Sequence, residues 1–211
     1  MTQTKILTHP LVDCHLTVLR NKHTSSSEFR HSVNRLSILL AHAATEHLKT
    51  TECPIETPIQ KMVGSQLLHR IGLVPIMRAG IGMVDAMLNM IPASEVWHLG
   101  FYRDEETAQP VQYYSKLPPS SPVDIAFVLD PMLATGGSAA MALNALQKWG
   151  VPQIKMISII AAPEGVEKLN HDFPDIEILT CCVDERLNKD RFIVPGLGDA
   201  GDRIFNTMGT H

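Results

Sequence analysis

The sequence predicts an α/β fold in which a mostly parallel sheet is flanked by helices, with a helical arm before it. Two observations support this prediction. Short apolar runs recur over residues 71–182, and most are apolar throughout, as in strands that helices cover on both faces. Segments with helical periodicity lie between these runs, and alternation of strand and helix is typical of a doubly wound α/β domain.

The apolar runs are predicted to be the strands of the α/β core. They cover residues 71–77, 96–101, 125–129, 154–161 and 176–180. Helical patterns lie between them over residues 82–90 and 139–149, and Gly150 and Pro152 end the second helix. Ligands bind at the carboxyl ends of the strands in such sheets, so the segments that follow the strands are the candidates for the functional site.

Residues 1–50 are predicted to form the helical arm. Ser25 to Ser27 offer N-cap candidates, and Glu28 follows in the first turn. Apolar residues then recur at steps of three and four and mark one face, namely Phe29, Val33, Leu36, Leu39, Leu40 and Ala43. Residues 50–70 contain Pro54 and Pro58 and show no clear pattern.

The length of 211 residues favours a single domain over residues 1–211. With 18 basic and 22 acidic residues, the formal charge of −4 offers no general attraction to nucleic acid or to an anionic membrane. Residues 1–16 show no secretory signal, and no run reaches the roughly 18 apolar residues of a membrane span. The four cysteines form no CxxC pair. We therefore expect a cytoplasmic protein with buried, reduced thiols and neither a membrane nor a nucleic-acid partner.

The segment after the run 125–129 has the chemistry of an anion-binding loop. It reads Asp130, Pro131, Met132, Leu133, Ala134, Thr135, Gly136, Gly137 and Ser138, and a helix follows. Its two glycines allow close backbone approach, while the helix N-terminus presents unpaired N–H groups to an anion. Asp130 stands at the strand end, where a carboxylate can accept hydrogen bonds from sugar hydroxyls. The Walker pattern GxxxxGK[ST] is absent, which argues against a P-loop.

This segment resembles the phosphoribosyl diphosphate (PRPP) signature of the type I phosphoribosyltransferases. The form DPMLATGGS, with proline after the acid, resembles that of the uracil phosphoribosyltransferase family. The resemblance implies that residues 130–138 bind PRPP. Within them, Asp130 holds the ribose hydroxyls and residues 135–138 hold the 5′-phosphate.

Three further stretches resemble the same family, and they occur in the same order. Residues 74–80 resemble a pyrophosphate-binding loop with its arginine at Arg78, and residues 102–107 carry Arg103 and open a flexible flap over residues 102–117. Residues 192–203 resemble the segment that receives uracil, and within them the uracil-binding residues are Ile193, Gly198, Asp199 and Ala200. Arginine suits these loops because its planar, charged fork can contact a diphosphate at two points.

The glycine-rich run near the C-terminus also makes sense on its own chemistry. Gly196, Gly198 and Gly201 fall within six residues, which predicts a sharply folded loop with many free backbone groups. Uracil presents N3–H flanked by O2 and O4, so backbone C=O and N–H groups can match its edge. A site that makes those hydrogen bonds discriminates against rings that lack them.

The resemblance implies transfer of the 5-phosphoribosyl group from PRPP to N1 of uracil, which gives UMP and diphosphate in pyrimidine salvage. It assigns catalytic roles to Arg78, Arg103 and Asp199, and these three also contact PRPP. The expected cofactor is Mg²⁺, held mainly through PRPP and water, with Asp199 as the candidate protein group. The resemblance also implies a homodimer or larger homo-oligomer, and GTP is an allosteric effector in some members of the family.

Three alternatives remain open on the sequence. A phosphoribosyltransferase for a purine base would need a larger pocket, usually with an aromatic stacking partner, and Phe192 is the only aromatic residue beside the run. A PRPP-sensing regulator of pyrimidine genes that binds RNA should show clustered basic residues. An inactive homologue with a scaffolding role is disfavoured because all four loops are intact.

Overall fold

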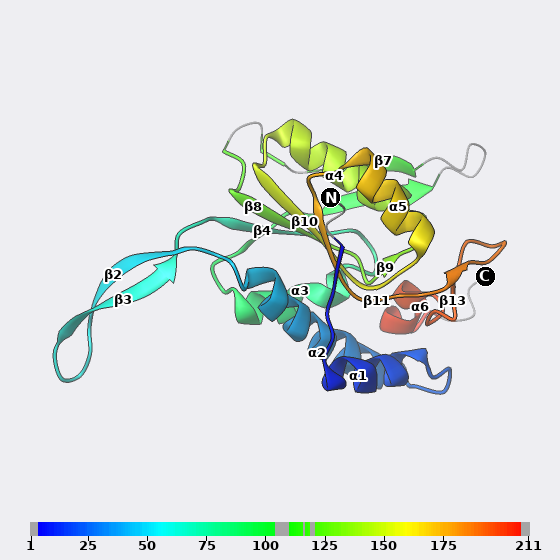
Figure 1. Cartoon of the computed structure of the whole chain (residues 1–211), viewed down its shortest axis with the longest axis horizontal. Helices are drawn as coiled ribbons and strands as arrows, with labels where there is room; N and C mark the ends of the chain where they lie inside the picture. Colours follow the sequence, from blue (N-terminus) through cyan, green and yellow to red (C-terminus); the bar gives the residue numbers. More distant parts are fainter. Residues whose placement is uncertain (1–3, 104–109, 116, 119–120, 208–211) are drawn as a thin grey trace.

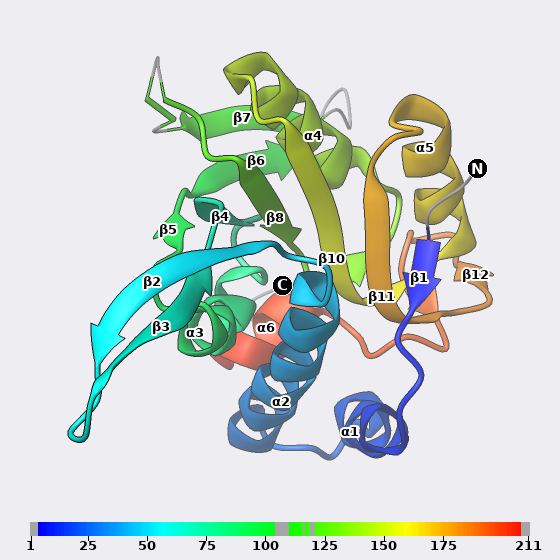
Figure 2. The same cartoon turned by 60° about the vertical axis from the view of Figure 1, so that its left-hand side comes forward.

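A computed structural model describes residues 4–103, 110–115, 117–118 and 121–207, and its centre is a seven-stranded sheet with parallel pairings (Figure 1). The strand order is β1-β11-β10-β8-β4-β5, and β9 pairs with β10 beyond the end of β8 (Figure 2). These strands are β1 (Thr4–Ile6), β4 (Ile71–Pro75), β5 (Glu95–Val96), β8 (Ile125–Leu129), β9 (Met132–Leu133), β10 (Gln153–Ala161) and β11 (Glu177–Val183).

Helices cover both faces of this sheet. They are α1 (Pro10–Arg20), α2 (Ser26–Thr45), α3 (Ile81–Met90), α4 (Gly137–Trp149), α5 (Pro163–Asp172) and α6 (Ala200–Phe205). In Figure 1, α4 and α5 lie above the sheet, and α1, α2, α3 and α6 lie below it. Along β8, Phe127 and Leu129 pack in the cluster with α2 and α3, while Ala126 and Val128 pack in the cluster with α4. The strand is therefore buried on both faces, which explains its continuous apolar run.

Helix α2 begins at the predicted position. Ser25 is the N-cap, its Oγ accepts a hydrogen bond from the backbone N–H of Glu28, and the Glu28 side chain accepts from the N–H of Ser25 in return. Phe29, Val33, Leu36 and Leu40 are all buried, as the periodicity predicts. This reciprocal capping satisfies two backbone donors that the first turn would otherwise leave unpaired.

Residues 50–70, which show no clear pattern in the sequence, form an antiparallel hairpin of β2 (Thr50–Glu56) and β3 (Lys61–Leu67) that projects from the body (Figures 1 and 2). Most of its side chains are exposed, including Ile55 and Ile59. A two-stranded ribbon with both faces in solvent imposes no alternation of polar and apolar residues, so its sequence carries no periodic signal.

Two segments differ from the predicted pattern. The run 96–101 divides between β5 and β6 (Leu99–Arg103), and β6 pairs with β7 (Pro110–Ser115) in a separate antiparallel ribbon. The N-terminal segment is not wholly helical, because β1 pairs in parallel with β11 at the sheet edge. Three residues are too few to show a strand period in the sequence.

The cysteines are free thiols, in agreement with the prediction, but they are not uniformly buried. Cys181 is buried, and burial raises its pKa to about 12. Cys14 is exposed on α1, so the prediction of burial is wrong there. Across the described ranges no helix has both the length and the apolar character that a bilayer crossing requires.

Candidate active site

Two of the predicted loops meet because they follow neighbouring strands. The register pairs Pro75 of β4 with Leu129 of β8, and the N–H of Ile76 donates to the carbonyl of Leu129. A Cβ added to Gly80 would lie 2.3 Å from the Leu129 carbonyl oxygen. Only glycine permits this approach, so the loop with Arg78 packs directly against the strand end from which Asp130 follows.

The loop over residues 130–138 forms a small pocket at the position predicted for the anion cradle. It lines a pocket of about 140 Å³, whose wall is formed by Asp130 and residues 132–139. Gly136 is the N-cap of α4 with φ of +75°, a conformation that favours glycine, and its carbonyl accepts from the N–H of Ala140. The N-terminus of α4 therefore opens onto the pocket, which suits a phosphate group.

Pro131 belongs to the sheet rather than to the pocket wall. It is buried, and its carbonyl accepts hydrogen bonds from the N–H groups of Ile159 and Ile160 at 3.1 and 3.0 Å. Leu133 is also buried in β9, and its carbonyl accepts from Ala162. Backbone hydrogen bonds of these two residues hold the loop against β10, and of the two only Leu133 also lines the pocket.

Asp130 lies in an environment that opposes its ionisation. Burial raises the pKa of its carboxyl group to about 7, and the nearby negative charge of Asp199 adds to the effect, although the Met132 N–H donates to the carboxylate. Because the charge of Asp199 disfavours the ionised form of Asp130, a cation or hydroxyl donors bound here would relieve the repulsion.

Arg78 connects the loop after β4 to the C-terminal segment. Its Nη2 atom lies 2.9 Å from Oδ1 of Asp202, and it follows a cis peptide bond with Met77. A Cβ on Gly201 would lie 3.5 Å from the same nitrogen and 3.2 Å from Oδ1 of Asp199. Arg78, Asp199 and Asp202 therefore gather around Gly201.

The C-terminal segment folds as a sharp turn before a short helix. β12 (Arg186–Leu187) pairs with β13 (Ile193–Val194), and Gly196 then adopts φ of +63°, where an added Cβ would lie only 2.1 Å from the Ile193 carbonyl oxygen. Gly198 has φ of +78° and is exposed. Asp199 is the N-cap of α6 and accepts from the N–H of Asp202.

Three loops from distant parts of the sequence thus form one site at the carboxyl end of the sheet, with an anion cradle, a carboxylate pair and an arginine. Comparison with known proteins decides the family, because the model of the uracil phosphoribosyltransferase family matches residues 6–207. The chain belongs to the uracil phosphoribosyltransferase family.

Curated relatives agree with this assignment, and a solved structure has the same fold. The chain is 51% identical to the uracil phosphoribosyltransferase of Roseiflexus sp. (strain RS-1), over 98% of this chain and 100% of the relative. It is 49% identical to that of Streptococcus mutans, with the same coverage of both chains. The solved structure of the AQ2163 protein from Aquifex aeolicus covers 99% of this chain and 100% of its own, with 35% identity and a TM-score of 0.92.

A more distant structure shows the fold alone. The adenine phosphoribosyltransferase from Rhodothermus marinus matches with a TM-score of 0.50 at 12% identity, over 71% of this chain and 78% of that one. The predicted fold class, a mostly parallel sheet flanked by helices as in type I phosphoribosyltransferases, is confirmed.

Three backbone groups of the glycine-rich run are paired with other parts of the chain. The carbonyl of Gly196 accepts from Arg20, and its N–H donates to Asp184. The carbonyl of Leu197 accepts from Arg203. The proposed uracil-binding residues are Ile193 and Ala200, which are buried, and Gly198 and Asp199, which are exposed. Both polar backbone groups of Gly196 and the carbonyl of Leu197 are therefore already paired within the chain.

Arg103 is the last residue of β6, and its side chain falls outside the described part of the structure. The predicted flap over residues 102–117 contains β7 and the end of β6, while residues 104–109 and 116 also lie outside that part. The structure thus brings together Arg78, Asp130 and Asp199, and the role of Arg103 stays a prediction.

Sequence reasoning missed three residues that shape the site. Gly165 lies in the first turn of α5, where a Cβ would lie 2.3 Å from the carbonyl oxygen of Ala134 in the cradle. Arg20 and Asp184 bind Gly196 from α1 and from the end of β11. No motif marks these residues, since each acts through a contact with a segment far away in the chain.

Proposed function

We propose that this protein transfers the 5-phosphoribosyl group of PRPP to N1 of uracil and releases UMP and diphosphate, as a step of pyrimidine salvage. One observation supports this above all. Arg78, Asp199 and Asp202 meet around Gly201, and the charge of Asp199 raises the pKa of Asp130 in the loop over residues 130–138. The groups expected to hold the leaving group, the base and the ribose are thus contiguous, in a chain of the uracil phosphoribosyltransferase family.

The donor side of the site is the loop over residues 130–138. The 5′-phosphate accepts hydrogen bonds from the backbone of residues 135–138 and from the hydroxyls of Thr135 and Ser138, at the N-terminus of α4. The Asp130 carboxylate accepts from the ribose hydroxyls. Those hydroxyls replace part of the hydration that burial removes, so PRPP binding favours the ionised form of Asp130.

The leaving diphosphate is assigned to Arg78 and Arg103. The transition state develops positive charge at the anomeric carbon while the diphosphate departs, so catalysis depends on positioning and on charge stabilisation. The guanidinium of Arg78 lies 2.9 Å from Asp202, a contact that favours one orientation of the side chain. This orientation lowers the entropic cost of presenting its guanidinium to the diphosphate.

The donor chemistry of the site fits Mg²⁺. Asp130 and Asp199 supply carboxylate oxygens close enough for one to raise the pKa of the other, and Mg²⁺ commonly binds one or two carboxylates together with substrate phosphates. Among the described residues, no group of three or more His, Cys, Asp or Glu side chains is arranged as a metal cage. Asp199 is the proposed protein contact. The bound ion would neutralise charge on the diphosphate.

The acceptor side is the segment that contains Ile193, Gly198, Asp199 and Ala200. Backbone groups from Gly198 onward face the N3 edge of uracil, and Ile193 contributes an apolar contact. Asp199 orients ribose and water beside N1, and its own orientation is set by the hydrogen bond from the Asp202 N–H.

The test is incubation of the purified protein with PRPP, magnesium and labelled uracil, with cytosine, hypoxanthine and orotate in parallel. UMP should form from uracil alone. Asp130→Asn and Arg103→Ala should each lower the rate by about a hundredfold or more, as for the loss of other charge-stabilising groups. Product from another base would overturn the acceptor assignment, and absence of product with every base would overturn the proposed activity.

Three finer features remain predictions with separate tests. A GTP effect on the initial rate would identify GTP as an effector. Light scattering of the purified protein would establish whether it is a homodimer or a larger homo-oligomer. Fractionation of cells would test the cytoplasmic location that the sequence predicts.

A further inference from the structure

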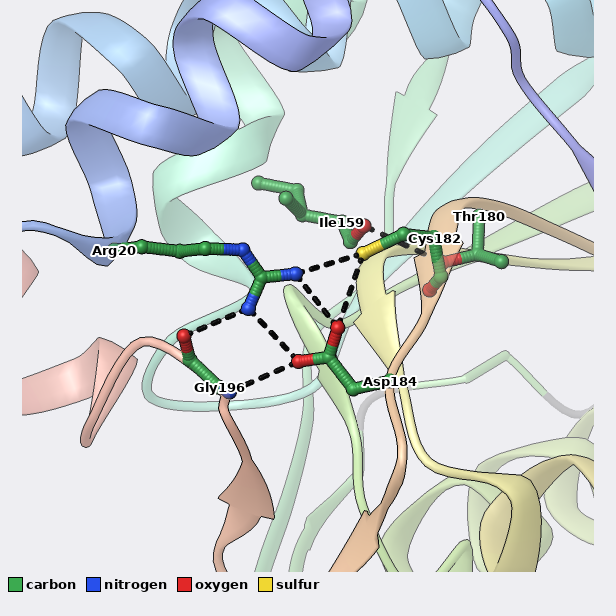
Figure 3. Close-up of polar contacts among 6 residues, drawn as sticks. All are labelled: Arg20, Ile159, Thr180, Cys182, Asp184 and Gly196. Atoms are coloured by element: carbon green, nitrogen blue, oxygen red, sulfur yellow. Dashed lines mark hydrogen bonds and ion pairs between the residues drawn. The ribbon is translucent and has the colours of Figure 1, made fainter.

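The last residue of α1 makes a two-pronged ion pair with a carboxylate at the end of β11 (Figure 3). Nη1 of Arg20 lies 2.9 Å from Oδ2 of Asp184, and Nη2 lies 2.6 Å from Oδ1. The side chain of Asp184 is only 5% exposed, and that of Arg20 is 27% exposed. A parallel arrangement of two charge-assisted bonds is directional as well as strong, so it fixes the orientation of both side chains.

The same pair holds the peptide groups of Gly196 from two sides. Nη1 of Arg20 donates to the Gly196 carbonyl oxygen at 2.8 Å, and the Gly196 N–H donates to Oδ2 of Asp184 at 2.9 Å (Figure 3). Arg20 and Asp184 lie 164 positions apart in the sequence. The turn at Gly196 is thus held by two elements outside the C-terminal segment.

The surroundings keep Asp184 ionised. Burial raises the pKa of Asp184, but hydrogen bonds from Arg20 and from the Gly196 N–H outweigh it and hold the pKa below its ordinary value. The Cys182 thiol, 3.2 Å from Arg20, has its pKa raised to about 12 by burial and by Asp184. Cys182 is therefore a neutral neighbour, and the charges that act on Gly196 are those of Arg20 and Asp184.

Gly196 occupies a critical place in the segment that receives the base. It lies between Ile193 and Gly198, two of the residues assigned to uracil, and its left-handed conformation sets the direction of the chain after β13. A rotation of its peptide groups would therefore displace Gly198 and Asp199 relative to the donor site. Hydrogen bonds to both of its polar groups oppose that rotation.

We propose that Arg20 and Asp184 are positioning residues for the acceptor base: by fixing the N–H and C=O of Gly196, they hold the segment that begins at Gly198 in the geometry that accepts uracil. This role rests on the proposed function, because it assumes that this segment binds the base. It gives α1 a part in base recognition, although α1 contributes no assigned substrate contact.

A purely structural role predicts a different result. If the pair only ties α1 to the sheet, its loss should lower thermal stability and affect both substrates alike. If the pair positions the base segment, its loss should act on uracil and spare PRPP, whose cradle over residues 130–138 has no contact with Arg20 among the hydrogen bonds of the described residues.

The first test uses Asp184→Asn and Arg20→Lys, which preserve size while removing the two-pronged pair. The KM for uracil should rise roughly tenfold to a hundredfold, as expected when a hydrogen bond to a charged group is lost. The dissociation constant for PRPP, measured by calorimetry without uracil, should stay within about twofold, a change too small to represent a lost contact.

The matched controls are Glu95→Gln and Arg70→Lys. Arg70 donates to Glu95 through Nε and Nη2 at 3.0 and 2.7 Å, so this is also a two-donor pair. It lies before the amino end of β4, away from the site. The control variants should leave the KM for uracil unchanged.

A chemical rescue separates positioning from general loss of structure. Arg20→Ala should raise the KM for uracil, and millimolar guanidinium should restore it in part, because the partly exposed space beside Asp184 can admit the free cation. Guanidinium should not improve the Asp184→Asn variant, in which the carboxylate is missing.

The outcomes distinguish this inference from the proposed function. If the unaltered protein makes UMP but the variants keep its KM for uracil, or lose affinity for PRPP and uracil equally, the positioning role is wrong while the activity stands. If the unaltered protein makes no UMP from uracil, the proposed function fails and the inference fails with it.

Discussion

The Nη2 atom of Arg78 lies 2.9 Å from Oδ1 of Asp202, which joins the loop after β4 to helix α6. The same Asp202 oxygen also accepts from the hydroxyl of Thr207 at 2.6 Å. Arg78, which is assigned to the leaving diphosphate, is thus ion-paired with the segment assigned to the base. The side chains assigned to the two halves of the reaction are therefore in direct contact.

Replacement of Arg78 should separate activity from stability. Arg78→Ala is expected to lower kcat/KM for PRPP by roughly 10²- to 10³-fold, as for other groups that stabilise developing charge. The free energy of unfolding should change by less than about 1 kcal/mol, because an exposed ion pair contributes little and Asp202 keeps its bond to Thr207. Steady-state kinetics and urea unfolding measure the two effects. Arg70→Ala, which also removes an exposed ion pair, is the control and should keep full activity. An equal loss of activity in Arg78→Ala and Arg70→Ala would contradict the assignment of Arg78.

The raised pKa of Asp130 predicts a pH-dependent stability. The folded protein holds this carboxyl at a pKa of about 7, against an ordinary value of 3.8. Between these values the unfolded chain is ionised while the folded protein keeps its proton, so the wild type loses stability as the pH rises through this window and no further above it. Asp130→Asn cannot ionise, so its melting temperature relative to wild type should increase across the same window and then level off. Scanning fluorimetry from about pH 5 to about pH 9 covers the change.

The same pKa has a functional consequence. If the ionised carboxylate receives the ribose hydroxyls, kcat/KM for PRPP should rise with pH and level off above about pH 7. This rise in kcat/KM reports the ionisation of Asp130 in the free protein, because kcat/KM reflects the ionisations of the unliganded state. The Asp130→Asn variant should have low activity without that rise. A wild-type profile of kcat/KM that is flat from pH 5.5 to pH 8.5, roughly one and a half units either side of pH 7, would contradict this prediction. It would show either that the pKa of Asp130 is not raised or that its ionised form is not needed for the reaction.

Gly165→Ala should damage the PRPP site from a distance. The added Cβ would lie 2.3 Å from the Ala134 carbonyl oxygen and 3.1 Å from that of Leu133. Backbone atoms cannot move aside as a flexible side chain can, so the cradle must shift, and overpacking of this kind costs about 1–3 kcal/mol. The affinity for PRPP should fall roughly tenfold or more by calorimetry, in proportion to that cost. Glu167→Ala, at an exposed position of the same helix, is the control and should bind PRPP normally.

The loops of the site could be predicted because their signals are local. An apolar strand, an acid, Thr-Gly-Gly-Ser and a helix occupy consecutive positions, and the structure forms a pocket there, with Gly136 in the left-handed conformation. The start of α2 was equally accessible, since Ser25 and Glu28 form a capping box within four residues. In both cases the physical cause of the structure lies within one short stretch.

The remaining features depend on contacts between distant segments. The Arg20–Asp184 pair spans most of the chain, and neither residue belongs to a motif. Gly165 is required by its approach to Ala134, which no local pattern reveals. The hairpin of β2 and β3 carries no periodic signal because both of its faces are largely exposed. What the sequence could not show was therefore which segments support the loops.

Arg203 should contribute more to stability than any exposed ion pair of the described structure. It is 7% exposed and donates to the carbonyls of Leu19, Asn21 and Leu197, with its guanidinium 4.3 Å from the centre of the Phe29 ring. Arg203→Met would fill similar space but leave these carbonyls without the donor. Unsatisfied buried groups cost about 1–3 kcal/mol each, so a total loss of about 3 kcal/mol or more is expected in urea unfolding.

The loss of stability in Arg203→Met should depend little on salt, since the partners are carbonyl groups rather than carboxylates. Arg203→Lys keeps the charge but has fewer donors, so its free energy of unfolding should lie between those of the wild type and Arg203→Met. A loss that disappears at high salt would instead show that an ion pair supplies the stability.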